Sequence, residues 1–408
     1  MKINATIIFL FVVTLISLNG FQTRVIPVNT LQFINFGCSL LLLGISIPYF
    51  FIKAKGFILP IQLITIAMII SMVMAYATWD QSFLASTKST VSAMQWVFFF
   101  YLYKKRISVK IIEDVVLVFG VLYVVLFLYQ FTHTGSVYFG WADEFIEDRG
   151  VIRVNFPGTG VFFLSNFIAL SRFSNEKKNR MIWGGYVLVG AICMILQVTR
   201  QYIVFLLFIY LFHFIRNVGG FKKIIVLMLF AIGVFLAVNS DNPISRGLIE
   251  KQKETSAESG EYIRILAGNY FIKNFSPSTI NLILGNGAPY GDSDLSNKEK
   301  YLQTLGYYLT DVGIIAVYVM FGIIAVIGFL LIFVKSFTLP LPPRYQYLKY
   351  YLWMLLFTCL TSDCLYGDKC LIANIFVLYC FQVEYEKSLQ TADADEKEDE
   401  FLAYHSIN

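Results

Sequence analysis

Arg200 is the residue of this sequence whose position most strongly suggests chemistry. It lies between two apolar runs, residues 181–198 and 202–215, and no acidic residue nearby in the sequence neutralises its charge. A cation at membrane depth costs free energy and usually marks a functional site. A guanidinium group stays charged and binds phosphate oxygens through two parallel hydrogen bonds. The sequence therefore predicts that Arg200 handles an anion, with contact to lipid phosphates at a tight turn as the simpler alternative.

Arg264 is the second candidate for binding an anion. The residues around it have the periodicity of a helix, and Gly268, Phe271 and Phe275 share one stripe with it. Gly268 is expected to leave room beside the guanidinium group. Four acidic residues precede Arg264 in the segment 250–261, so a structural ion pair is the alternative role.

Membrane helices must hold these arginines. Of the 408 residues, 57% are hydrophobic and only 14% are charged, which is the composition of a polytopic membrane protein. A bilayer needs about 20 apolar residues for each helical span. The apolar runs predict an all-α integral membrane protein with about twelve spans. The predicted spans lie near 4–21, 31–52, 57–79, 86–103, 112–131, 158–171, 181–198, 201–215, 223–239, 307–334, 347–365 and 370–383.

The basic residues of the connections predict how these spans are oriented. One set of connections carries clusters of Lys and Arg, for example in residues 104–110 and 172–180, whereas the alternate short connections carry few. Because basic residues are retained on the cytoplasmic side, both termini are predicted to be cytoplasmic. Two longer loops, 132–157 and 240–306, then lie on the outer face.

The outer loops offer individual charged groups rather than a basic surface. Residues 240–306 hold seven Lys or Arg and eight Asp or Glu, a net charge of −1. An anion on this face would therefore be bound by particular arginines. We interpret residues 1–383 as one membrane domain. Residues 384–408 are acidic and are predicted to form a disordered cytoplasmic tail.

Several function classes are disfavoured by missing motifs. The sequence has no glycine-rich phosphate loop, no H-E-x-x-H and no G-x-S-x-G, so an ATPase, a metalloprotease and a serine hydrolase are disfavoured. Its six cysteines show no metal-ligand spacing, and we predict no metal and no cofactor. The net charge of +5 is explained by the cytoplasmic connections and does not indicate nucleic-acid binding.

Three elements of the sequence combine basic residues with the starts of spans. The first is residues 153–158 (Arg-Val-Asn-Phe-Pro-Gly), and the second is the Thr-Arg pair at 199–200. The third joins Arg264 to the turn 284–287 (Leu-Gly-Asn-Gly) and to 311–313 (Asp-Val-Gly), which begin a span. Together they resemble the bacterial O-antigen polymerase and O-antigen ligase superfamily.

This resemblance covers roughly residues 140–330. It implies a GT-C-like membrane fold in the bacterial inner membrane. The implied reaction is glycosyl transfer between two polyprenyl-pyrophosphate-linked oligosaccharides, the donor and the acceptor, on the outer face, building O-antigen or capsule. A hydroxyl of the incoming repeat unit attacks the anomeric carbon of the growing chain, and the lipid pyrophosphate departs without help from a metal. Membrane lipids and a chain-length regulator are the other partners that it implies.

The resemblance also implies roles for particular residues. Arg200 and Arg264 would be catalytic, because they would stabilise the pyrophosphate as negative charge builds on it. The implied substrate-binding residues are Arg153, Arg149, Gly285, Gly287, Lys298, Lys300, Tyr301 and Asp311. Arg149 and Gly160 have an R-x10-G spacing that occurs in some polymerases. Structural alternatives are a turn shaped by Gly285 and Gly287, and an Asp311 that favours the positive end of a helix.

The chain departs from the family pattern at one point. Ligases and many polymerases have a His shortly before the acidic-x-Gly element, whereas residues 290–313 contain none. Lys298, Lys300, Tyr301 or Gln303 would have to replace it. Two other functions stay open: a ligase that moves finished polymer to an acceptor, and a flippase or secondary transporter. Transporters gather polar groups near the bilayer midplane, so the outer position of the polar residues here disfavours transport.

Overall fold

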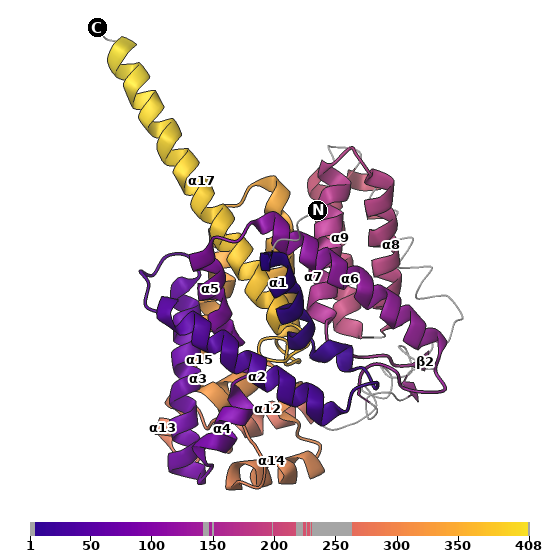
Figure 1. Ribbon diagram of the computed structural model, residues 1–408, viewed down its shortest axis with the longest axis vertical. Helices are drawn as coiled ribbons and strands as arrows, with labels where there is room; N and C mark the ends of the chain where they lie inside the picture. The colour runs from indigo at the N-terminus through magenta and orange to yellow at the C-terminus, as the bar shows by residue number, and fades with distance from the viewer. Residues whose placement is uncertain are drawn as a thin grey trace.

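Helices make up most of the described residues in the computed structural model, which describes residues 5–141, 147–148, 151–197, 199–217, 223–225, 227–228, 230 and 263–406 (Figure 1). The β structure among these residues is a two-residue antiparallel pair, β1 (Glu147–Asp148) with β2 (Val151–Ile152). The predicted helical class is therefore confirmed. The helices in chain order are α1 (Ala5–Ser17), η1 (Asn19–Gln22), α2 (Val28–Ser46), η2 (Ile47–Tyr49), α3 (Ile58–Trp79), α4 (Phe83–Thr90), η3 (Ala93–Val97), α5 (Phe98–Lys105), α6 (Val109–Thr132), α7 (Thr159–Asn175), α8 (Arg180–Leu196), α9 (Arg200–Asn217), α12 (Ile263–Lys273), α13 (Thr279–Leu284), α14 (Asp294–Thr304), η5 (Leu309–Asp311), α15 (Ile314–Thr338), η6 (Pro343–Tyr345), α16 (Gln346–Thr358) and α17 (Leu371–Ser406).

Four of the described helices are long and apolar enough to cross a membrane. They are α2 with its continuation η2, α3, α6 and α15. Helices α1 and α8 are apolar but shorter. The chain is therefore a helical protein of the membrane-embedded type, and the twelve predicted spans stay a prediction. The span predicted at 223–239 lies mostly outside the described residues.

The span predicted at 86–103 is not one continuous helix. It is divided into α4, η3 and α5, and Lys88 lies in the last turn of α4. Ser and Thr are frequent in α4, and these residues compete with the helical backbone for hydrogen bonds. The interruption is buried, because all five residues of η3 are shielded from solvent.

Helix α7 is a central helix of the part of the molecule that holds α6, α8 and α16. Every residue from Thr159 to Ser171 is buried. The helix packs against α6, α8, α16 and α17, so it has protein on all sides. The span predicted at 158–171 is short for crossing a bilayer. It is still helical because it lies in the protein interior, where a largely apolar helix is expected.

Helix α15 is broken at Gly322, where φ is 78° and ψ is 179°. The break leaves carbonyl groups without their usual helical donors. Residues 285–287 supply the donors, because the Asn286 and Gly287 N–H groups donate to the Val319 and Met320 carbonyls at 3.0 and 2.8 Å. Non-helical backbone at membrane depth is tolerated where protein satisfies it in this way.

The close fit at this break requires glycines. Gly285 has a φ of 86°, and a Cβ there would lie 2.4 Å from the Met320 carbonyl oxygen. Gly287 has a φ of 82°, and a Cβ there would lie 2.5 Å from the Cβ of Ala75 on α3. Both glycines therefore let the turn 284–287 fill the space between α3 and α15, which is the structural alternative considered from the sequence.

Helix α17 continues through the acidic segment to Ser406 and projects beyond the other helices (Figure 1). The disorder predicted for 384–408 thus differs from the structure, in which Ala, Glu and Lys of this segment are good helix formers. The predicted domain boundary at 383 also lies inside the helix. Beyond it, Glu386 accepts hydrogen bonds from Tyr103 at 2.6 Å and Arg106 at 2.9 Å, so the helix stays attached past that point.

Candidate functional site

One cavity of about 660 Å³ lies where several helices begin. Helices α7 and α9 begin at its wall with Thr159 and Arg200, and α15 and α17 begin just after lining residues. The full lining is Arg153, Val154, Asn155, Thr159, Gln197, Thr199, Arg200, Gln201, Tyr202, Arg264, Thr310, Asp311, Thr361, Ser362, Asp363 and Lys369. Four of the residues proposed from the sequence, Arg153, Arg200, Arg264 and Asp311, are thus brought together.

Arg153 is held by a segment that packs between aromatic rings. Phe156 is fully buried, with its ring centroid 4.5 Å from that of Tyr123 and 6.1 Å from that of Phe21. Gly158, with a φ of 111°, lets the chain pass these rings, because a Cβ there would lie 3.0 Å from Phe21 and 3.1 Å from Tyr123. The aromatic packing fixes the backbone that carries Arg153 at the cavity.

Arg200 begins the first turn of α9, and it lines the cavity together with Thr199, which precedes the helix, and with Gln201 and Tyr202. The Nε and Nη2 atoms of Arg200 are shielded from solvent. The Gln201 side chain donates a hydrogen bond to the Thr361 hydroxyl and so fixes the turn to the connection between α16 and α17. The positive end of a helix and a guanidinium group both favour an anion at this point.

Arg264 lies at the start of α12 and forms an ion pair with Asp311, with 3.5 Å between Nη2 and Oδ2. Both side chains remain partly exposed, at 35% and 45%, so the pair is weak and can open for a ligand. The predicted stripe is buried at Phe271 on α12 and at Phe275, which lies two residues after the helix ends. Gly268 does not make room for the guanidinium group; it faces α15, because a Cβ there would lie 3.0 Å from Ile315.

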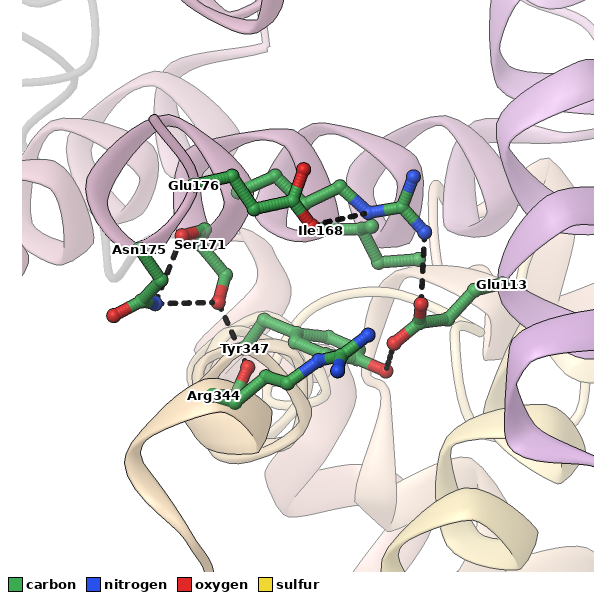
Figure 2. A pocket seen from close by; sticks show the side chains of 8 residues that line it. Glu113, Ile168, Ser171, Asn175, Glu176, Arg344 and Tyr347 are labelled. Atoms are coloured by element: carbon green, nitrogen blue, oxygen red, sulfur yellow. Dashed lines mark hydrogen bonds and ion pairs between the residues drawn. The ribbon is translucent and has the colours of Figure 1, made fainter. Parts of the chain in front are cut away.

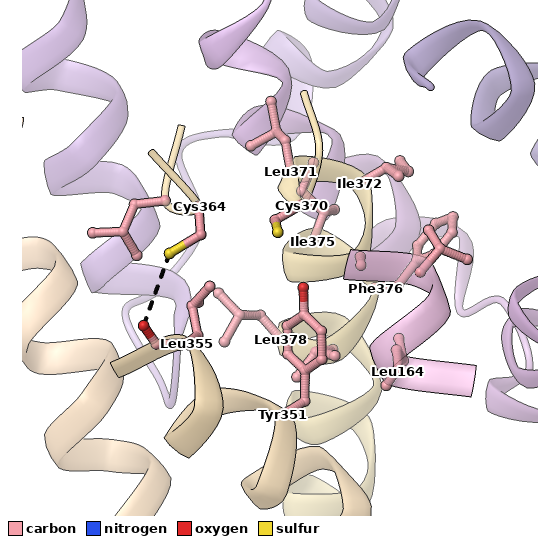
Figure 3. Packing of buried hydrophobic residues seen from close by; sticks show 14 of the residues in the cluster. Leu164, Tyr351, Leu355, Cys364, Cys370, Leu371, Ile372, Ile375, Phe376 and Leu378 are labelled. Carbon is pink, nitrogen blue, oxygen red and sulfur yellow. Dashed lines mark hydrogen bonds between the residues drawn. The ribbon is translucent and has the colours of Figure 1, made fainter. Parts of the chain in front are cut away.

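The connection between α16 and α17 supplies four lining residues that the sequence did not single out for a role: Thr361, Ser362, Asp363 and Lys369. Two buried side chains hold this connection. Asn374 donates to the Cys364 carbonyl at 2.8 Å, and Tyr351 donates to Asn374 at 2.7 Å. Figure 3 shows Cys364 and Cys370 packed with Tyr351 and the leucines and isoleucines of α16 and α17. A buried Asn in an apolar helix was the signal that a polar loop end docks there.

The other residues proposed from the sequence do not line the cavity. Lys298 donates to the Phe275 carbonyl at 2.7 Å and lies over the Trp79 ring, and burial lowers its pKa. Lys300 pairs with Asp292 at 3.2 Å, and Tyr301 is 63% exposed. Gly285 and Gly287 serve the break in α15, whereas Arg149 lies outside the described residues. Gln303 donates to Glu299 on α14 and is absent from the lining.

The cavity carries positive charge. Its described lining holds four cations, Arg153, Arg200, Arg264 and Lys369, against two carboxylates, Asp311 and Asp363, which leaves a net charge of +2. Lys369 also lies over the Trp141 ring, 4.9 Å from its centroid. A dianion would balance this lining. Within the described part of the chain, no group of three His, Cys, Asp or Glu side chains is placed to hold a metal ion.

A second, smaller cavity of about 190 Å³ lies at the opposite end of α7 (Figure 2). Arg172 contacts Glu113 there at 2.8 Å, and Tyr347 donates to the same carboxylate at 2.7 Å. The guanidinium group also lies over the Trp183 ring at 4.9 Å. The buried charges of this cluster are balanced by the protein itself, so we interpret it as a structural tie between α6, α7 and α16.

A scan against protein-family models gives no match for this chain, and a search of curated proteins gives none either. The function must therefore be argued from the residues and their arrangement.

Proposed function

We propose that this protein is a membrane glycosyltransferase that joins polyprenyl-pyrophosphate-linked oligosaccharide repeat units into a surface polysaccharide such as O-antigen or capsule. One observation carries the proposal. Arg153, Arg200 and Arg264, which come from three separate segments, line a single cavity whose described lining has a net charge of +2. A diphosphate diester carries about two negative charges, because each phosphate has one strongly acidic group, and it matches that lining.

The reaction needs a stabilised leaving group more than it needs a strong nucleophile. When an acceptor hydroxyl attacks the anomeric carbon of the donor, the bond between that carbon and the phosphate oxygen breaks. The pyrophosphate keeps the electron pair and gains negative charge. Preorganised guanidinium groups in a partly dry cavity lower the free energy of this state without a divalent cation. Arg200 is the leading candidate because it also lies at the positive end of α9.

In our proposal this cavity lies on the outer side of the membrane, and the distribution of basic residues supports that side. Helices α7, α9 and α15 all begin at or next to the cavity, and their last turns carry Arg172, Arg216 and Lys335. Basic residues are retained in the cytoplasm, so the cavity ends of these helices would face outward. We extend the proposal to a bacterial inner-membrane protein of GT-C-like architecture with cytoplasmic termini.

The two alternative functions gain less from the geometry. A ligase of the resembled superfamily would be expected to place a His near the acidic-x-Gly element, and the described lining contains none. A transporter would use a broken helix to bind cargo. Helix α15 is broken, but the turn 284–287 fills the break with backbone hydrogen bonds, so the break does not open to the cavity.

A reconstituted reaction tests the proposal. The purified full-length protein in lipid nanodiscs is mixed with polyprenyl-pyrophosphate-linked repeat units, without nucleotide, and products are resolved by size. We expect a ladder of chains that differ by one repeat unit, together with release of polyprenyl pyrophosphate. Transfer of preformed polymer to a different acceptor, with no ladder, would instead assign the ligase function.

A further inference from the structure

The large cavity of about 660 Å³ contains carboxylates as well as the arginines proposed to bind pyrophosphate. Asp311 and Asp363 are the two acidic side chains of its described lining. Glycosyl transfer to a hydroxyl gains from a proton acceptor as well as from cations. We propose, on the basis of the function proposed above, that Asp363 is the general base that takes the proton of the acceptor hydroxyl.

The backbone around Asp363 forms a tight turn that fixes the main chain from which the carboxylate extends. The Tyr366 and Gly367 N–H groups donate to the Asp363 carbonyl at 3.0 and 2.7 Å. A Cβ on Gly367 would lie 2.5 Å from Asp363 Oδ2, so glycine at this position allows the carboxylate to lie over the turn. A catalytic base needs such a fixed position, because proton transfer requires hydrogen-bond distance to the reacting hydroxyl.

This turn is joined to the segment that carries Arg200. Thr361, two residues before Asp363, accepts a hydrogen bond from Gln201 in the first turn of α9. On its other side, Asn374 donates to the Cys364 carbonyl at 2.8 Å. The proposed base and the leading pyrophosphate ligand are therefore held to the same wall of one cavity. A donor bound through its pyrophosphate at Arg200 would present its anomeric carbon to an acceptor beside Asp363.

Other groups are less suited to accept the proton. Burial and the neighbouring charge of Asp363 raise the pKa of Tyr366 well above its usual range, so this phenol stays neutral. The described lining also lacks the four residues whose sequence positions could let them replace the missing His: Lys298, Lys300, Tyr301 and Gln303. Asp311 is the ion-pair partner of Arg264, and proton transfer to it would break that pair in every turnover.

The proposed step is balanced. The oxygen of the acceptor hydroxyl forms a bond to the anomeric carbon, and its proton passes to an Asp363 carboxylate oxygen. The bond from the anomeric carbon to the phosphate oxygen breaks, and the pyrophosphate departs with the electron pair toward Arg153, Arg200 and Arg264. Release of the proton to water then restores Asp363.

The test compares Asp363→Asn with Asp363→Glu and with Asp292→Asn in the nanodisc assay. Asp292 is 98% exposed and outside the cavity lining, so it provides a matched loss of one carboxylate. We expect Asp363→Asn to lower kcat about 10²- to 10⁴-fold. We also expect the wild type to lose rate at low pH as its base is protonated, and Asp363→Asn to lack this loss. Binding of farnesyl pyrophosphate, a short probe of the leaving group, should be unchanged or tighter. Asp363→Glu should recover part of the rate, and Asp292→Asn should match the wild type.

Two results would overturn the assignment of the base. One is an Asp363→Asn rate within threefold of the wild type. The other is a slow variant that keeps the low-pH fall of the wild type, because Asp363 would then act only on the shape of the turn. Both results leave wild-type chain growth intact, so they separate failure of the base from failure of the proposed function, in which the wild type itself makes no ladder.

Discussion

The two polar cavities at opposite ends of α7 contain the same kinds of residue but differ in how far their charges are balanced within the protein. At the small cavity, Arg172 contacts Glu113 at 2.8 Å, and Tyr347 satisfies the other oxygen of that carboxylate. Among the described lining residues of the large cavity, four cations face two carboxylates around a volume of about 660 Å³. An arginine whose charge the protein balances at close range holds helices together. An excess of arginines around an open volume leaves charge for a ligand.

The largest expected effect is a loss of stability when the ion pair of the small cavity is removed. Replacing Arg172 by Ala leaves Glu113, whose side chain is only 4% exposed, as a buried carboxylate without its cation. Removing one partner of a buried ion pair costs about 3–5 kcal/mol, so we expect a marked loss of thermal stability in detergent. The rate per folded molecule should stay near that of the wild type. A large loss of rate in protein of normal stability would contradict the structural role.

The next effect concerns the large cavity, where we expect a loss of rate rather than a loss of stability. Arg200→Ala should reduce the polymerisation rate about 10²- to 10³-fold, the usual cost of removing one preorganised charge-stabilising group. Thermal stability should change little. Arg24→Ala is the matched control, because Arg24 is exposed and outside the cavity lining. Equal rates for both variants would show that Arg200 has no catalytic role.

The smallest effect sharpens the comparison within the large cavity. Asp311→Asn removes the partner of Arg264 in a pair whose members are 35% and 45% exposed, so stability should change by less than about 1 kcal/mol. Affinity for farnesyl pyrophosphate should rise, because the guanidinium group no longer has a competing carboxylate. Calorimetric titration measures this, and weaker binding would show that Asp311 orients Arg264 for the ligand.

The sequence predicted those parts of the site whose signal is local. Arg200 stands out because its apolar neighbours make a charge costly, and Arg153 and Arg264 precede or follow recognisable starts of helices. The helical class followed from composition. Asp363 and Lys369 could not be assigned a role in the same way, since they reach the cavity only when Asn374 and Gln201 dock the connection between α16 and α17.

Some sequence signals had structural explanations that depend on distant partners. Gly285 and Gly287 have the pattern of a ligand-binding turn, yet their tight contacts are with Met320 and Ala75. Lys298 is placed by Trp79 and Phe275, which are far from it in the sequence. Periodicity and charge cannot indicate which helix will accept a turn. The acidic segment after residue 383 was predicted to be disordered from its charge, although its residues also favour a helix.

The break at Gly322 also bears on how the chain is made. Residues 285–287 are synthesised before α15, and their N–H groups are needed by the carbonyls of Val319 and Met320. If the broken α15 left the insertion machinery without the turn 284–287, those two oxygens would be exposed to lipid tails, at a cost of several kcal/mol each. We therefore expect the turn 284–287 to pack against α15 before the broken helix is exposed to lipid.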